Sequence, residues 1–384
     1  MNPEPQGAVE GNTERAALVH REVLQLTLLI FIAIAGFFLT RVVAANNRAM
    51  SARDAAAWYD RGQQALESGQ IDLAIDAFRR ATVRNRTETA YVLALARALA
   101  LHHDDEAARQ VLLTLRESQP ENADINLELA RLAAHGADVT EAVRFYHNAL
   151  YAPWPAERTD ARRRVRIELI QFLLTHDQPG RAGAELLAVA ADLPDEPAAH
   201  VQVAQLFFQA GDYTHSLDHF ERAVRLAPDD GVALAGAGQS AFRLGEYARA
   251  RSYLVRAPRD VDEVATTREI VELVLADDPL ANRIGSAERR RRLLMDVEYA
   301  RQRLTACIGE RAGEPKDDEV VFQGEMEALS RQLSRTAVLD QDTIETGVDL
   351  VQRVAQHIMQ RCASATVRDR ALVLIGRQHS GAAR

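Results

Sequence analysis

The chain has 384 residues, and its 46 basic residues are outnumbered by 55 acidic ones, which gives a formal net charge of −9. Nucleic-acid binding needs a clustered positive excess to neutralise phosphates, so this balance argues against a nucleic-acid partner. Two cysteines exclude a disulfide-dense scaffold and a four-cysteine zinc site. Hydrophobic residues make up 47% of the chain but aromatic residues only 5%, a composition typical of closely packed helices.

The N-terminal part contains a long apolar run. No residue from Val23 to Thr40 is charged, and a helix of this length spans about 27 Å, close to the hydrocarbon thickness of a bilayer. We therefore predict an N-terminal tail over residues 1–22, a transmembrane helix over 23–45 and a linker over 46–54.

A cleaved signal peptide is the alternative interpretation of this run, because Val43-Ala44-Ala45 resembles a cleavage site. The segment before the run is long for a signal peptide and contains four glutamates, which favours an uncleaved anchor. Arginines flank the run on both sides, so the positive-inside rule leaves its orientation open.

A fixed period organises residues 55–262. Small residues recur every 34 positions, with one interval of 40, at Ala74, Ala108, Ala142, Ala182, Ser216 and Ala250. Twelve positions before them lie the mostly small residues Gly62, Ala96, Ala130, Ile170, Ala204 and Gly238. Four positions after them lie the large apolar residues Phe78, Leu112, Tyr146, Leu186, Phe220 and Leu254. Small side chains on one helix make room for bulky ones on the next, so the pattern predicts antiparallel helix pairs joined at corners such as Gly69, Gly211 and Gly245.

Residues 55–88 resemble a tetratricopeptide repeat, with signature positions occupied by Trp58, Gly62, Gly69, Ala74, Phe78 and Ala81. Arg61 and Arg86 depart from the usual Leu and Pro of that family. Further repeats are predicted at 89–122, 123–156, 163–196, 197–230 and 231–262. The resemblance implies an all-α fold, a right-handed superhelical solenoid of about six helix pairs, and a non-enzymatic role in binding proteins through a groove.

Six extra residues separate the third and fourth repeats, in a stretch where two prolines flank Trp154. Aromatic residues are common interface anchors, so one hypothesis gives this loop a contact with a partner. The alternative is that Trp154 packs on the edge of the solenoid and covers the insertion.

The period ends after Asp262, and we predict that residues 263–384 form a helical cap on the apolar face of the last repeat. Helices are predicted over 264–276, 286–307, 319–334, 341–363 and 366–377. Cys307 and Cys362 lie near the ends of two of these helices, and we predict a disulfide between them; two buried thiols are the alternative. A disulfide would favour a periplasmic location for the part after the transmembrane helix.

Three patterns that suggest chemical sites also have simpler explanations. Gly236 to Ala241 matches a GxGxxA fingerprint but falls inside a predicted helix, and His215 and His219 lack a third metal ligand. The arginines from Arg289 to Arg292 are interpreted as a solvated helix face or a contact with anionic lipid. Without a catalytic triad, Walker or HExxH pattern, we predict no enzyme activity, cofactor or metal.

The family resemblance also implies which residues face the groove. The fifth positions of the first three repeats are Tyr59, Leu93 and Leu127, and the ninth positions of all six are Gln63, Arg97, Arg131, Gln171, Gln205 and Gln239. Amides suit the backbone of an extended peptide, and the two arginines suit a carboxylate. The alternative is an ordinary surface whose charges pair among themselves. The carboxylate clamp that binds chaperone tails needs a basic residue at position five and Asn at nine, and both are absent.

These features together predict a single-pass scaffold of the bacterial inner membrane that binds a partner protein or extended peptide. The alternative is an accessory or regulatory subunit of a membrane enzyme, secretion or envelope-assembly complex, with the transmembrane helix as its contact surface.

Overall fold

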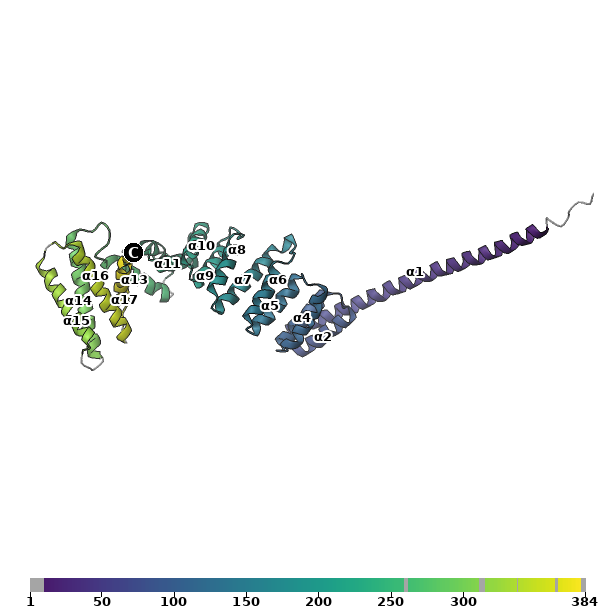
Figure 1. The fold of residues 1–384 in the computed structure, drawn as a ribbon, viewed down its shortest axis with the longest axis horizontal. Coiled ribbons are helices and arrows are strands. Elements are labelled where there is room, and N and C mark those ends of the chain that lie inside the picture. The colour runs from purple at the N-terminus through teal and green to yellow at the C-terminus, as the bar shows by residue number, and fades with distance from the viewer. Residues whose placement is uncertain (1–9, 259–261, 311–314, 337, 363–364, 381–384) are drawn as a thin grey trace, which may run out of the picture. The chain divides into compact units, whose positions relative to one another are not determined.

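The computed structural model describes residues 10–258, 262–310, 315–336, 338–362 and 365–380, and these ranges contain helices and no strand (Figure 1). The helices are α1 (Glu10–Glu67), α2 (Ile71–Arg84), α3 (Thr89–Leu101), α4 (Asp105–Ser118), α5 (Ala123–His135), α6 (Val139–Leu150), α7 (Thr159–Thr175), α8 (Pro179–Ala190), α9 (Pro197–Gln209), α10 (Tyr213–Leu226), α11 (Gly231–Arg243), α12 (Tyr247–Leu254), α13 (Asp262–Asp277), α14 (Ser286–Glu310), α15 (Asp317–Arg335), α16 (Gln341–Arg361) and α17 (Val367–Ser380). The chain divides into two compact units, Met1–Val165 and Arg166–Arg384.

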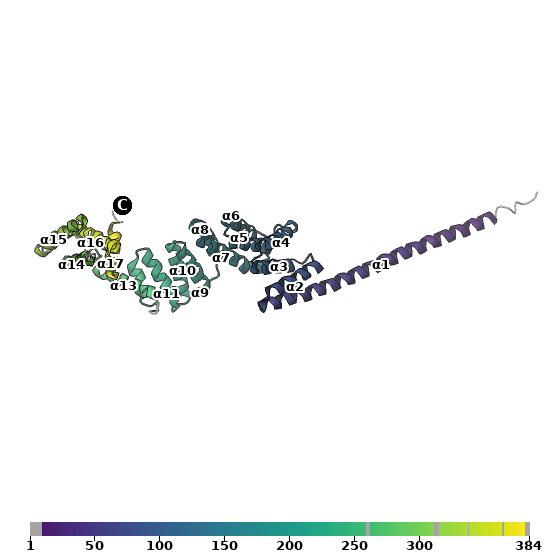
Figure 2. The same ribbon diagram turned by 90° about the horizontal axis from the view of Figure 1, so that it is seen from below.

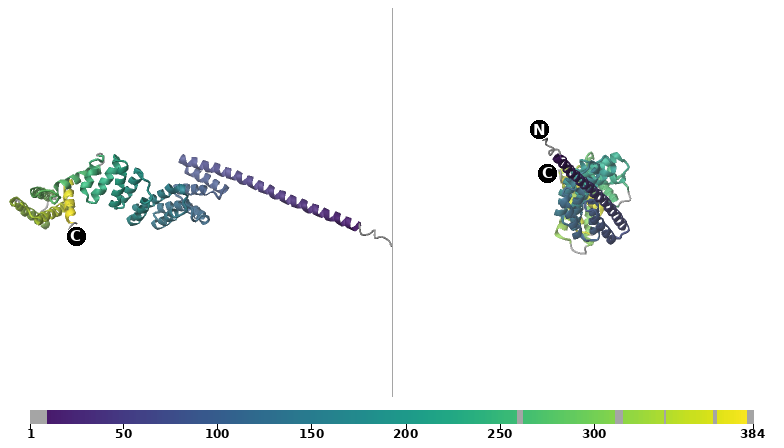
Figure 3. Two further views of the ribbon diagram at one scale, coloured as in Figure 1. Left: turned by 90° about the horizontal axis from the view of Figure 1, so that it is seen from above. Right: turned by 90° about the vertical axis from the view of Figure 1, so that its right-hand side faces the viewer.

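Helix α1 joins the apolar run, the expected linker and the first helix of the first repeat in one unbroken helix, as Figures 2 and 3 show. Residues 46–54 are helical because they contain no glycine or proline that would end the helix. The apolar side chains of the run are exposed, and the hydroxyls of Thr27 and Thr40 donate to carbonyls of their own helix. By length and composition, this part of α1 can cross a membrane.

The first unit contains three antiparallel helix pairs, formed by the end of α1 with α2, α3 with α4, and α5 with α6. The small and bulky residues of the period meet as expected. A side chain at Gly62 would collide with the ring of Phe78, and a Cβ at Gly238 in the second unit would lie 2.6 Å from Leu254. The small series therefore makes room for the bulky series within each pair.

All six corners between paired helices contain a residue with positive φ. Three are the predicted glycines, Gly69, Gly211 and Gly245, with φ of 71°, 80° and 77°. The other three are His103, Ala137 and Asp177, with φ of 63°, 55° and 54°. The corner geometry follows the repeat period even where glycine is missing.

The second unit buries one hydrophobic core that runs from the last repeats into the C-terminal helices. Leu254 of α12, Val271 of α13, Leu304 of α14 and Ile358 of α16 all belong to it. Helices α13 to α17 lie within a few residues of the predicted ranges. Cys307 of α14 pairs with Cys362 after α16 as a disulfide, with Cα atoms 5.6 Å apart.

The arginine run at the start of α14 differs from the expected solvated face. Arg290 donates to the carbonyl of Leu333 at 2.6 Å, and Arg292 donates to the carbonyls of Leu275 and Asp278 at 3.3 and 3.1 Å. The last carbonyls of a helix have no partner within the helix, and a guanidinium can serve several of them. Arg290 and Arg292 therefore connect helices, whereas Arg291 is exposed.

Candidate functional site

A pocket of about 470 Å³ lies in the first unit between α3, α4 and α5. Its apolar lining consists of Ala96, Ala100, Leu101, Ala108, Leu112 and Leu132. Arg97, Glu128 and Arg131 also line it, as do His103 and His135. The register that places small residues on adjacent helices thus leaves a hollow with an apolar floor and a charged edge.

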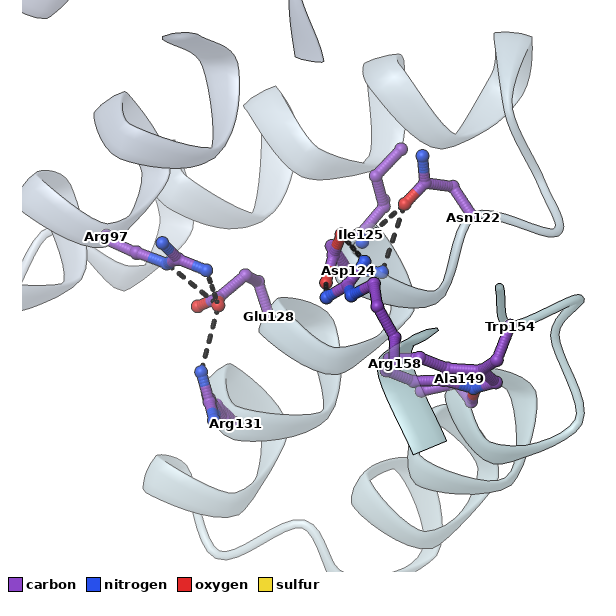
Figure 4. Close-up of polar contacts among 9 residues, drawn as sticks. All are labelled: Arg97, Asn122, Asp124, Ile125, Glu128, Arg131, Ala149, Trp154 and Arg158. Atoms are coloured by element: carbon purple, nitrogen blue, oxygen red, sulfur yellow. Dashed lines mark hydrogen bonds and ion pairs between the residues drawn. The ribbon is translucent and has the colours of Figure 1, made fainter. Parts of the chain in front are cut away.

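At the charged edge, two arginines converge on one buried carboxylate (Figure 4). Arg97 donates from Nε and Nη2 to Oε1 of Glu128 at 2.8 and 2.6 Å, and Arg131 donates from Nη1 to the same oxygen at 3.0 Å. Glu128 is only 8% exposed, whereas both arginines are exposed. The shared carboxylate fixes the positions of the two guanidiniums at this edge of the pocket.

Sequence reasoning identified Arg97 and Arg131 but missed Glu128. The alternative interpretation is an ordinary surface whose charged residues pair with one another. It describes part of the geometry, because both arginines bind a carboxylate of the protein itself. Glu128 lies between the buried Leu127 and Leu129. A lone charge in an apolar stretch, near two register-matched arginines, was the signal that could have revealed it.

Two histidines line the pocket near the corner of the second repeat. The rings of His103 and His135 stack with centroids 6.2 Å apart, and Nδ1 of His135 contacts Oδ2 of Asp105 at 3.0 Å. His103 is the residue with positive φ at the corner between α3 and α4. The pocket therefore has polar groups at more than one part of its rim.

The residues predicted at the fifth positions of the repeats contribute more to packing than to an exposed surface. Leu93 and Leu127 are buried, and Tyr59 packs against Tyr91 and Phe78 with ring centroids 5.0 and 5.6 Å apart. Gln63 is half-buried on α1. Neither Tyr59 nor Gln63 lines the pocket that contains Arg97.

Two predicted glutamines line a separate pocket of about 670 Å³ in the second unit. Gln205 and Gln239 lie there with Phe208, Val232 and Ala235. Gln171 is exposed on α7 and lines neither of these two pockets. The ninth positions therefore fall at two pockets, with Gln63 and Gln171 outside both.

The insertion loop folds back on the first unit. The indole N–H of Trp154 donates to the carbonyl of Ala149 at 2.8 Å, and the Arg158 guanidinium lies 4.9 Å from the indole centroid (Figure 4). Arg158 also binds both carboxylate oxygens of Asp124 at 2.7 and 2.9 Å, and this hydrogen bonding lowers the pKa of Asp124. Trp154 is half-buried, and these contacts match the packing alternative.

The histidine pair of α10 has protein partners in place of a metal. His215 contacts Asp212 at 2.7 Å, and His219 contacts His200 of α9 at 3.0 Å. Burial, with a contribution from His200, lowers the pKa of His219. The described residues contain no group of three ligands that could hold a metal ion. Residues 236–241 lie within α11, where a phosphate-binding turn cannot form.

Comparison with known proteins identifies the repeats. The family model for the tetratricopeptide repeat matches residues 39–91, 171–231 and 204–263. No curated protein matches the chain.

Several solved structures resemble the chain at low sequence identity. Pseudomonas aeruginosa pilF is 15% identical, covers 59% of this chain and 98% of its own, and has a TM-score of 0.41. PilW, a type IV pilus biogenesis factor, is 16% identical over 55% and 97% of the two chains, with a TM-score of 0.39. The C-terminal part of a tetratricopeptide protein from Cytophaga hutchinsonii is 9% identical over 79% and 98%, with a TM-score of 0.42. The family-model matches, the repeat period and the helix pairs together show that the chain contains tetratricopeptide repeats.

Proposed function

We propose that this chain is a non-enzymatic scaffold, held in a bacterial membrane by α1, that binds a partner protein through the pocket between α3, α4 and α5. The observation that carries the proposal is the pair Arg97 and Arg131, held in place by Glu128 above an apolar floor. Prearranged donors lose little freedom on binding, so such an edge suits an anionic group.

The shape and charge of the pocket indicate what part of a partner fits. Its alanine and leucine floor accepts an apolar side chain, and the arginine edge accepts a carboxylate beside it. Nη1 of Arg97 has no partner among the described residues and is available to a ligand. We therefore expect an extended segment that places a carboxylate next to an apolar residue.

The proposed location is the bacterial inner membrane, with the repeats in the periplasm. The length and composition of α1 support the anchor. The pairing of Cys307 with Cys362 supports an oxidising compartment for the second unit, because cytosolic disulfides are rare.

The experiment captures partners from detergent-solubilised membranes and identifies them by mass spectrometry. Removing the arginines alone would leave Glu128 buried and unpaired, so the test variant carries Arg97→Gln, Glu128→Gln and Arg131→Gln together. We expect this variant to keep its melting temperature and to lose the partner. The matched control, Arg79→Gln, removes an exposed arginine of α2 and should retain the partner.

Two outcomes would contradict the proposal. Equal recovery of the same partner by the triple variant would exclude the pocket as its binding site. Loss of the partner on Phe37→Ala and Phe38→Ala, with the triple variant unaffected, would favour the alternative accessory subunit that binds through its transmembrane helix.

A further inference from the structure

The end of α2 lies at the side of the first unit from which the apolar run of α1 extends. Helix α2 follows α1 after a short turn and packs antiparallel to it. Nη1 of Arg84, the last residue of α2, lies 3.5 Å from Oδ2 of Asp54 on α1. The loop 85–88 therefore begins at the end of the α1 and α2 pair that is nearer to the apolar run.

Four exposed arginines lie within six residues of Asp54 or Arg84 along the chain, and we name them the basic collar: Arg48, Arg53, Arg84 and Arg86. Arg48 donates from Nε to the carbonyl of Ala44, one turn earlier, which directs its side chain towards the apolar run. The acidic residues at the same place are Asp54 and Glu88, so the collar keeps a positive excess. Val83, also here, is 67% exposed although it is apolar.

The distance along α1 fits a contact with lipid headgroups. Asp54 lies nine residues after Ala45, which is about 14 Å along the helix axis. The headgroup layer extends about 5 to 8 Å beyond the hydrocarbon core on each side. The gap that remains between the headgroup layer and the level of Asp54 on α1 is within the length of an arginine side chain. It is also within the screening length of about 8 to 10 Å at physiological salt.

We propose that the basic collar and Val83 bind the anionic phospholipid surface next to α1, so that the first unit lies against the membrane. This inference rests on the proposed membrane anchor. Guanidinium groups bind phosphate in a fork geometry, and an exposed apolar side chain next to Arg84 suits the headgroup boundary. Charge complementarity and continuity with the apolar run of α1 argue for lipid as the occupant.

The test uses the full chain in nanodiscs, made either of phosphatidylcholine alone or with 30% phosphatidylglycerol. A fluorophore on Val83→Cys reports contact with lipids that carry a quencher in the headgroup region. The matched control is Ser68→Cys, an exposed residue in the turn at the other end of the α1 and α2 pair. The native disulfide is left intact during labelling.

We expect at least twofold stronger quenching at position 83 in discs with phosphatidylglycerol than in discs without it, and little quenching at position 68. The difference should vanish in a collar variant with Arg48→Gln, Arg53→Gln, Arg84→Gln and Arg86→Gln that keeps the wild-type melting temperature. Equal quenching at both positions, or no effect of phosphatidylglycerol, would overturn the inference. Failure of the chain to enter nanodiscs at all would instead contradict the proposed anchor.

Discussion

Several buried carboxylates of this protein are paired with arginines. Glu128 is bound by Arg97 and Arg131 in the first unit, and Asp369 by Arg303 at 3.1 Å in the second. An ionised carboxylate in such a position needs this pairing to offset the loss of water. Asp296 differs, because its partner Arg368 is shared with a second carboxylate from Asp277.

The environment of Asp296 predicts a dependence of stability on pH. Burial raises its pKa to about 8, Asp277 adds to this shift, and Arg368 opposes it. Because the folded pKa lies above the unfolded value of about 3.9, stability from the bound proton is complete below pH 4. It is lost as the pH rises through about 8. Asp296→Asn mimics the neutral form, so we expect it to resist urea better than the wild type at pH 9.

The same comparison at pH 5 provides the control, because the wild-type side chain is then already protonated in the folded state. The advantage of the variant should shrink or disappear there. A wild-type chain that is equally stable at pH 5 and pH 9, or more stable than the variant at pH 9, would contradict the assignment.

At the scale of the site, the sequence predicted the two arginines but not Glu128, the carboxylate that they bind. Register assigned Arg97 and Arg131 to one surface because both occupy the ninth position of a repeat. It gave no role to the position of Glu128, because burial of a charged side chain depends on the packing of three helices. Leu93 and Leu127 show the same limit, since the expected groove positions are covered by neighbouring side chains.

At the scale of elements, the corners show how strongly the repeat imposes one backbone geometry. A single residue with positive φ lets the second helix of a pair reverse direction after the first. Glycine adopts this conformation without strain, whereas an L-residue with a side chain pays a steric cost. Ala137 and Gly211 occupy equivalent corners, so they form a natural pair for comparison.

Ala137→Gly should stabilise the protein by up to about 1.5 kcal/mol. Relief of the left-handed conformation is worth about 1 to 2 kcal/mol, and the greater freedom of glycine in the unfolded chain removes about 0.4 to 1 kcal/mol of that gain. Gly211→Ala should destabilise the protein by a similar amount for the opposite reason. Urea unfolding of both variants checks the prediction, and effects of the same sign would show that the corners are not equivalent.

At the scale of the whole molecule, the fold class could be predicted because one period repeats through half the chain. Helix pairs, glycine corners and the C-terminal helices all followed from the spacing of small, bulky and helix-ending residues. The unbroken α1 was not expected, since a change from apolar to polar composition suggests a linker even where nothing ends the helix. The pairing of Cys307 with Cys362 depends on the packing of α14 and α16, which periodicity does not specify.

With the proposed membrane anchor, this pairing predicts the side of the membrane on which the second unit lies. The Cα atoms of Cys307 and Cys362 are 5.6 Å apart, within the usual range for a disulfide, and such bonds persist in oxidising compartments. Cells quenched with acid and alkylated should therefore yield a peptide in which the two cysteines are cross-linked. Its loop of 55 residues can stabilise the fold by up to about 4 kcal/mol, so reduction should lower the melting temperature.

A single-cysteine variant tests the compartment of the second unit independently of disulfide formation. In Cys307→Ser the remaining thiol, Cys362, is half-buried after α16, where a small maleimide can reach it more readily than the buried Cys307. With a cytoplasmic N-terminus and periplasmic repeats, a membrane-impermeant maleimide should label Cys362 in intact spheroplasts. Labelling only after lysis, together with two free thiols in the wild type, would reverse the orientation and place the repeats in the cytoplasm. The scaffold would then serve partners on that side, because a single membrane pass leaves everything after the apolar run of α1 in one compartment.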